Sequence, residues 1–364
     1  MRHTLKREAH CALLRRALTL PAPSECLTMT SSIRATSFRH LALVLPFVAI
    51  ASFGCAKEQD GKEQHLSRAN DYFAANQYDK AEKEYREVFR FAPDDPVAVR
   101  QLAIIYLDQG QVPQAYPLLK KAAELEPDNQ ETQLKLGEIF LAMGDYTQAR
   151  DTALQILEKQ PGQDKALLLL AYASRKPEDI EETRKLVQSL REKEQDRPSY
   201  HLALGVLDLR QNDQTRAEGE FKAALNLDSK SADALASLGG LYWARKDLKE
   251  ADQALKTAAD LAPPRSPIRL RYVDFKVQTG AASEAKQILE DMSQKLPDYL
   301  PPRVYLMKMA CAEQQDEGCA TRVQGILAQD PTNFDALYLS GSRHLAEGDA
   351  EKAVREFEQL GSTY

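Results

Sequence analysis

One 34-residue period runs through most of this chain and constrains its fold more than any other feature. A small residue returns at the same point of the period with no insertion or deletion, at Ala81, Ala115, Ala149, Thr183, Ala217, Ala251, Ala285, Cys319 and Ala353. Proline follows twelve residues later in six of these units, at Pro93, Pro127, Pro161, Pro263, Pro297 and Pro331. A strict period of this length is typical of stacked helical units.

The unit over residues 130–163 shows the physical basis of the period. Its apolar residues fall at helical spacing on two segments, which Gly144 separates. A glycine at that point suits a short turn between antiparallel helices. Gly137 and Ala149 are small, as expected where two helix backbones approach closely, and Gly239 holds the same position as Gly137 three units later. Pro161 is expected to end the second helix.

This pattern of small and large residues resembles the tetratricopeptide repeat family, over residues 62–364. With the recurrent alanine at the family's twentieth position, nine units begin at Lys62, Pro96, Gln130, Asp164, Pro198, Ala232, Ser266, Leu300 and Phe334. The resemblance implies an all-α fold, a right-handed solenoid of stacked antiparallel helical hairpins. The fourth and eighth units match poorly but keep the register, so we interpret them as degenerate repeats. For the fourth unit, sequence drift and a hinge are the two alternatives.

The last unit carries Val354, Phe357 and Leu360 on its second helix, with no polar capping helix after it. Repeat arrays normally end in such a cap. We therefore expect either that the sequence is a fragment or truncated reading frame of a longer protein, or that a partner or second copy covers this end.

The N-terminal 54 residues differ from the repeats in charge and hydropathy. They hold seven basic and two acidic residues, a balance of +5. Because the whole chain has a net charge of −6, the remaining residues carry −11. Residues 41–54 are mostly apolar, too few to span a bilayer comfortably but suited to the core of a secretion signal. We predict a leader over residues 1–54, in which 29–54 form the signal peptide and 1–28 reflect either a misassigned start or a long basic region.

Cys55 follows this apolar run directly and is preceded by Gly54. The junction resembles a bacterial lipoprotein signal, which implies lipidation of Cys55 and a short polar tether over residues 55–61. Ser52 and Phe53 differ from the residues usual before such a cysteine. A plain signal peptide or an uncleaved anchor is therefore the alternative.

Two further cysteines, Cys311 and Cys319, lie within one hairpin of the repeats. In an oxidising compartment they are candidates for a disulfide. The alternative is that both are small packing residues, with Cys319 in the alanine position.

No pattern for catalysis, metal binding or a cofactor emerges from the sequence. The six histidines form no HExxH pair and no His/Cys ligand spacing, and there is no phosphate-binding loop and no GxSxG motif. We therefore predict that the chain is not an enzyme and needs neither metal nor cofactor. The acidic body also argues against nucleic acid as a partner.

The resemblance implies instead a concave groove for protein partners, lined by the first helix of each hairpin. Aromatic and arginine side chains are the better anchors for a partner. Our candidates at the groove positions are Phe73, Arg100, Tyr172, Arg175, Trp243 and Tyr338. For each one, a packing or solvent-exposed role is the alternative. Leu66 and Glu131 stand where chaperone-binding members need a base, so a receptor for chaperone tails is not expected.

Three functions are consistent with these features. The first is a lipid-anchored scaffold on the periplasmic side of a bacterial membrane, with the outer membrane favoured, because the array resembles repeat lipoproteins that accompany exopolysaccharide export and PEP-CTERM-type protein sorting. The second is a cytosolic adaptor. The third is an accessory subunit that embraces an envelope enzyme.

Overall fold

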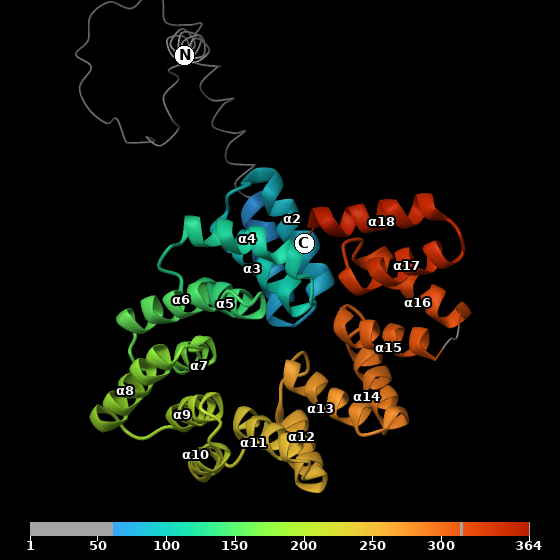
Figure 1. Ribbon diagram of the computed structural model, residues 1–364. Coiled ribbons are helices and arrows are strands. Elements are labelled where there is room, and N and C mark those ends of the chain that lie inside the picture. The colour runs from blue at the N-terminus through green and yellow to red at the C-terminus, as the bar shows by residue number, and fades with distance from the viewer. Residues whose placement is uncertain (1–60, 314–315, 364) are drawn as a thin grey trace, which may run out of the picture. The chain divides into compact units, whose positions relative to one another are not determined.

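The structure is a computed structural model and describes residues 61–313 and 316–363; every regular element in these two ranges is an α-helix (Figure 1). A helix over residues 61–74 comes first, and the others are α2 (Tyr78–Phe91), α3 (Pro96–Asp108), α4 (Val112–Leu125), α5 (Gln130–Ala142), α6 (Tyr146–Lys159), α7 (Asp164–Ala173), α8 (Pro177–Lys193), α9 (Pro198–Arg210), α10 (Gln214–Leu227), α11 (Ala232–Arg245), α12 (Leu248–Leu261), α13 (Pro267–Gln278), α14 (Ala282–Lys295), α15 (Leu300–Ala312), α16 (Asp316–Gln329), α17 (Phe334–Ala346) and α18 (Ala350–Thr363). The predicted all-α solenoid of stacked hairpins is confirmed. The predicted leader, nearly all of the tether, and Cys55 lie outside the described residues.

The two helices of most hairpins are joined at a residue in the left-handed backbone conformation. Glycine supplies it in four units, with φ between 78° and 84°, at Gly110, Gly144, Gly280 and Gly348. Other residues adopt it at the same register in three units, at Asn76, Asn212 and Lys246. The next residue then donates its backbone N–H to a carbonyl five residues back, as Gln111 does to Tyr106 at 2.7 Å, which closes the first helix.

A side chain in front of most first helices satisfies the free N–H groups of the first turn. Asp95 accepts from the backbone N–H of Ala98 at 3.0 Å, and Asn129 does the same for Thr132 at 3.1 Å. Equivalent N-caps recur in later hairpins, as at Asn333. These caps fix where each hairpin begins, because the first-turn N–H groups have no partner within the helix.

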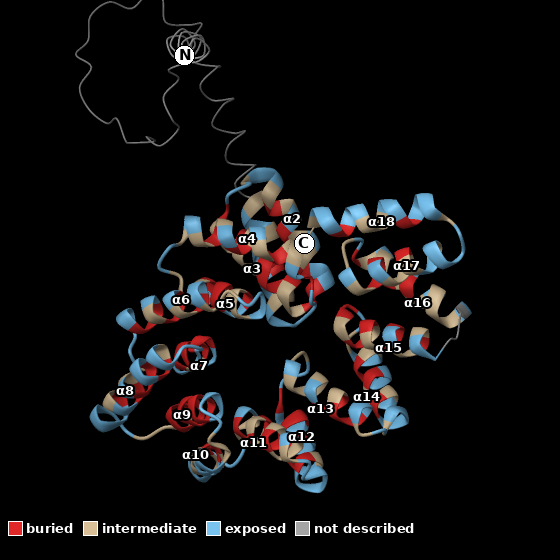
Figure 2. Cartoon of the chain, viewed as in Figure 1, coloured by how far each residue is buried: buried red, intermediate tan, exposed pale blue. Residues whose placement is uncertain are grey.

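The helices of one hairpin meet at the small residues of the period. Ala81, Ala115, Ala149, Ala217 and Ala251 are each fully buried. A Cβ atom added at Gly239 would lie 2.7 Å from Cγ of Leu255 and 3.0 Å from its backbone nitrogen, so a larger residue cannot enter without displacing α12. Buried residues follow these contacts through the array, and every residue of α9 from Ser199 to Asp208 is buried (Figure 2).

The irregular fourth unit keeps its packing through polar contacts. Ser174 and Thr183 replace the usual aromatic and alanine, and both are buried. Their hydroxyl oxygens lie 2.8 Å apart, and the Ser174 hydroxyl also donates to the carbonyl of Leu170 at 2.8 Å. Because these buried polar groups satisfy each other, the substitution does not open the hairpin.

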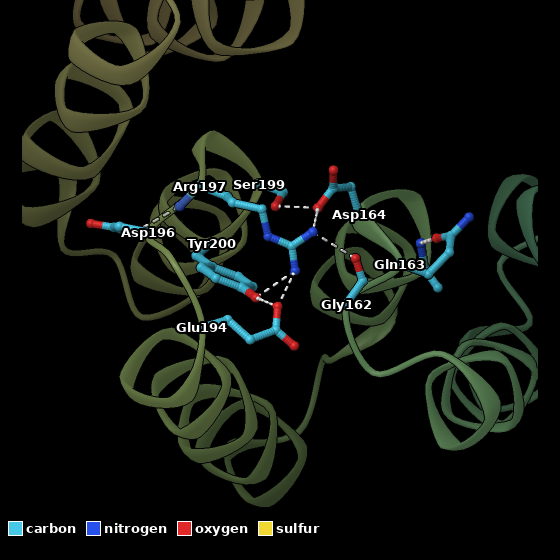
Figure 3. Close-up of polar contacts among 9 residues, drawn as sticks. Gly162, Gln163, Asp164, Glu194, Asp196, Arg197, Ser199 and Tyr200 are labelled. Atoms are coloured by element: carbon cyan, nitrogen blue, oxygen red, sulfur yellow. Dashed lines mark hydrogen bonds and ion pairs between the residues drawn. The ribbon is translucent and has the colours of Figure 1, made fainter.

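Arg197 joins the two ends of this fourth unit (Figure 3). Its guanidinium donates to the carbonyl of Gly162, just before α7, at 2.9 Å. It also pairs with Asp164, the first residue of α7, at 3.1 Å. The same group pairs with Glu194 at 2.7 Å and lies 4.7 Å from the ring centre of Tyr200. Both of these residues follow α8 in the chain. The unit is thus held against its neighbour without the proline found in other units.

Residues far apart in the sequence also meet. The Gln114 side chain in α4 donates to Asp330 at 2.8 Å, and the backbone N–H of Leu300 donates to the carbonyl of Gln109 at 3.3 Å. The guanidinium of Arg265 lies 4.6 Å from the ring centre of Tyr78. Early hairpins therefore contact loops of late ones. Over the residues described, no helix is both long enough and apolar enough to span a membrane.

Candidate functional site

The six predicted groove residues fall into two groups in the structure. Tyr338 is 52% exposed and Tyr172 is 36% exposed. Phe73 instead stacks on Tyr78 with ring centres 5.4 Å apart. Trp243 makes an edge contact with Phe275, whose ring centre is 5.4 Å away. The two partly buried aromatics thus take part in packing, which was the stated alternative for each of them.

The two predicted arginines also differ. Arg100 is paired with Glu126 and is largely buried. Arg175 lies over the ring of Tyr146, 4.1 Å from its centre, and donates to its hydroxyl at 2.6 Å. The exposed guanidinium of Arg175 is therefore held in place by an aromatic ring rather than by a carboxylate.

A pocket of about 230 Å³ opens beside Tyr172, on the first helices of four consecutive hairpins. Its lining residues come from α7, α9, α10, α11 and α13 and are Tyr172, Val206, Leu209, Arg210, Gln214, Phe221, Ser237, Gly240, Leu241, Ala244 and Arg271. Tyr172, Val206 and Gly240 are 34 residues apart and share the ninth position of their units. One repeat position in three successive hairpins thus contributes to the wall of the pocket.

Gly240 leaves room for a charged side chain in this pocket. A Cβ atom at Gly240 would lie 2.1 Å from Nη2 of Arg271. A residue with a side chain at this position would therefore displace the guanidinium. The adjacent Gly239 serves the helix crossing with α12, so the two neighbouring glycines have different structural roles.

The pocket is rich in positive charge. Burial lowers the pKa of Arg210, and the nearby charge of Arg175 lowers it further. Burial raises the pKa of the Tyr172 hydroxyl, an effect that the charges of Arg271 and Arg210 oppose and that of Asp233 reinforces. Within the described ranges, neither Arg210 nor Arg271 lies within 4.0 Å of a carboxylate oxygen.

Two larger hollows lie mainly between second helices. One, of about 550 Å³, is lined by α6 and α8 and includes Asp151 and Glu158. The other, of about 430 Å³, involves α12, α13 and α14, and there Lys256 already pairs with Asp260 at 2.8 Å. The first hollow presents carboxylates beside leucines, whereas the pocket at Tyr172 lies on first helices and contains a residue predicted for the groove, so we take the pocket at Tyr172 as the candidate site.

Sequence reasoning named Tyr172 and Arg175 but missed Arg210 and Arg271. These two arginines occupy the thirteenth and sixth positions of their units, outside the positions from which candidates were chosen. The glycine at the ninth position of the sixth unit was the available signal, because a small residue there leaves space in the groove.

Cys311 and Cys319 lie at the other end of the array. A disulfide joins them in the structure and links α15 to α16, with Cα atoms 4.7 Å apart. Both side chains pack against the buried cluster that contains Leu300 and Met307. In the part of the chain that the structure describes, no three His, Cys, Asp or Glu side chains are grouped as metal ligands.

Comparisons with known proteins identify the repeat. Two family models described as tetratricopeptide repeat match the chain, one at residues 106–163 and 244–309 and the other at residues 66–130 and 202–266. Human tetratricopeptide repeat protein 21B is 26% identical over 211 residues, which are 54% of this chain. The match covers only 15% of the human protein's length.

Several solved structures are also similar to this chain. A tetratricopeptide repeat protein from Parabacteroides merdae has 12% identity and a TM-score of 0.47, covering 65% of this chain and 93% of that one. Yeast Tom70 has 15% identity and a TM-score of 0.43, covering 84% of this chain and 77% of its own. Residues 41 to the end of MamA from Desulfovibrio magneticus have 20% identity and a TM-score of 0.41, covering 47% and 97%.

Proposed function

We propose that this chain, which belongs to the tetratricopeptide repeat family, is a scaffold that holds protein partners along the first helices of its hairpins. The observation that carries this proposal is the pocket at Tyr172. It combines apolar side chains with polar groups that are free to bind a ligand, as binding sites commonly do. Exposed aromatic and arginine side chains are also the residue types that most often anchor a partner.

We further propose that the scaffold is exported and lipid-anchored on the periplasmic side of a bacterial membrane, with the outer membrane favoured. There it would support an envelope assembly or a polysaccharide-export system. This part rests on the sequence, namely the apolar run over residues 41–54 followed at once by Cys55. A cytosolic adaptor and an accessory subunit that embraces an envelope enzyme are the competing functions.

Site-specific photo-crosslinking tests the scaffold function. Benzoylphenylalanine placed at Tyr172 or Tyr338 in the full chain should crosslink to protein partners in cells, because both side chains are exposed on first helices. The same probe at Lys249, an exposed residue of the second helix α12, is the matched control. Equal crosslinking from Lys249, or none from either tyrosine, would contradict partner binding along the first helices.

Acylation of Cys55 tests the location. We expect a palmitate analogue to label the wild-type chain and Cys55→Ala to lose both the label and membrane association. A wild-type chain that stays unlabelled, whether it is membrane-bound or found in the cytosolic fraction, would count against the lipid anchor. The cytosolic fraction would favour the adaptor function.

A further inference from the structure

We propose that the pocket between α7, α9, α11 and α13 is a receptor for a carboxylate in a partner protein, an Asp or Glu side chain with an apolar neighbour in an extended segment. This inference rests on the proposed scaffold function and names the chemistry that its groove selects. Three features carry it: unpaired arginines, the space at Gly240, and the apolar surface beside them.

The charge of the pocket contrasts with that of its surroundings. The chain has a net charge of −6, yet Arg210 and Arg271 both line the pocket beside Tyr172, and the charge of Arg175 acts on Arg210. Some other arginines of the first helices pair with carboxylates, as Arg245 does with Glu218, and Arg269 donates to the backbone carbonyl of Ala262 at 2.9 Å. In contrast, Arg210 and Arg271 have no carboxylate within 4.0 Å among the described residues.

An anion from a partner would complete this arrangement. The positive charges of Arg175 and Arg210 repel each other, and a bound carboxylate would offset that repulsion. A guanidinium offers two parallel N–H donors, which match the two oxygens of a carboxylate. Asp233 contributes one negative charge near Tyr172, so the two positive charges of Arg210 and Arg271 face one negative charge before a ligand binds.

The geometry limits the ligand to part of a longer chain. The pocket volume of about 230 Å³ is below the roughly 300–1,000 Å³ of sites that enclose small molecules. Val206, Leu209 and Leu241 supply an apolar wall beside the arginines. A segment with one acidic side chain and one apolar side chain therefore fits both the size and the chemistry. The acidic remainder of the chain disfavours a nucleic acid.

Selection from a random twelve-residue peptide library, displayed on phage against the immobilised full-length chain, tests the inference. We expect the selected peptides to be enriched in Asp or Glu beside an apolar residue. Synthetic copies should bind about tenfold more weakly or worse after Asp→Asn or Glu→Gln changes in the peptide. They should also lose binding to the double variant Arg210→Glu with Arg271→Glu, for which the selection should instead favour Lys and Arg.

Two further variants separate pocket chemistry from general charge and from folding. Lys230→Glu with Lys249→Glu makes the same change in net charge at exposed residues outside the pocket and should alter binding by less than about twofold. Gly240→Ala keeps the charge and favours the helix, but its Cβ displaces Arg271, so binding should weaken without loss of helix content.

Selected peptides without acidic enrichment, or peptides that bind the Arg210→Glu and Arg271→Glu variant as well as the wild type, would overturn the inference. The scaffold function would then still stand on crosslinks from Tyr172 or Tyr338. If the selection yields no binding peptides, the inference is overturned as well. If Tyr172 and Tyr338 also give no crosslinks, the scaffold function is overturned with it.

Discussion

Two glycines offer a direct test of the helix crossings, because the same substitution should stabilise the chain at one of them and not at the other. Gly239 lies at the crossing of α11 and α12, where an added Cβ would be 2.7 Å from Cγ of Leu255. Gly219 lies inside α10, and a Cβ there would meet nothing within 4 Å. Replacing glycine by alanine in a helix interior stabilises the helix by about 1 kcal/mol at either position.

The difference between the two variants therefore isolates the packing cost. Forcing one extra carbon into a filled core costs about 1–3 kcal/mol. We expect Gly219→Ala to stabilise the chain by up to about 1 kcal/mol. Gly239→Ala should be neutral or destabilise by up to about 2 kcal/mol, because its packing cost is offset by the same gain in helix propensity. Part of the cost at Gly239 cannot relax, since the contact includes the backbone nitrogen of Leu255.

Urea denaturation followed by tryptophan fluorescence measures this difference locally. Trp243 is the chain's single tryptophan and lies one helical turn after Gly239. It reports directly on the hairpin of Gly239, and on α10 with Gly219 through the packing of α10 against α11. A rise in the unfolding midpoint of similar size for both variants would refute the assignment of Gly239 to the crossing.

Other contacts lead to two further predictions. Arg184→Leu should destabilise the chain by about 3 kcal/mol in urea denaturation, because it removes the 2.8 Å partner of the fully buried Asp208. Arg191→Leu, which breaks a partly exposed ion pair, should cost less than about 1 kcal/mol, and equal losses would contradict the burial of Asp208. The hydrogen bond with Glu220 raises the pKa of His201 above 6.5, so its stabilisation is complete below pH 6.5 and is lost as pH rises through the raised value. The Tm of the wild type should therefore fall more steeply above this pH than that of His201→Gln, and parallel curves would exclude a role for this histidine.

The sequence predicts the fold well because the repeat depends on local rules. A small residue at a crossing and a break between two helices act within one hairpin, so each can be identified without tertiary information. The residue at the turn between the two helices is the exception, because its type varies from unit to unit. Glycine marked it at Gly110 and Gly144, but Asn212 and Lys246 adopt the same left-handed conformation. Asparagine visits this region readily, whereas lysine is held there by the surrounding hairpin.

The candidate site was harder to predict, because groove positions serve both packing and binding. Trp243 and Tyr172 both lie at groove positions of their first helices, yet the first packs against Phe275 and the second lines the pocket. What distinguishes them is which side chains the following hairpins present. Because Gly240 has no side chain, Arg271 can lie in the pocket with Tyr172. The pocket is lined by residues from four hairpins, so it cannot be identified from the sequence of one.

Contacts between distant hairpins lie further beyond sequence patterns. The period specifies how each hairpin meets its neighbour, but a small rotation at every step accumulates along the array. Which early loop meets which late loop depends on that sum, so no motif at Gln114 or Asp330 marks their hydrogen bond. Once formed, such a contact couples units that a nearest-neighbour description treats as independent. The free energy of unfolding the early hairpins then includes the loss of contacts to the late ones, and the stability of the array is no longer the sum of its hairpins and their shared interfaces.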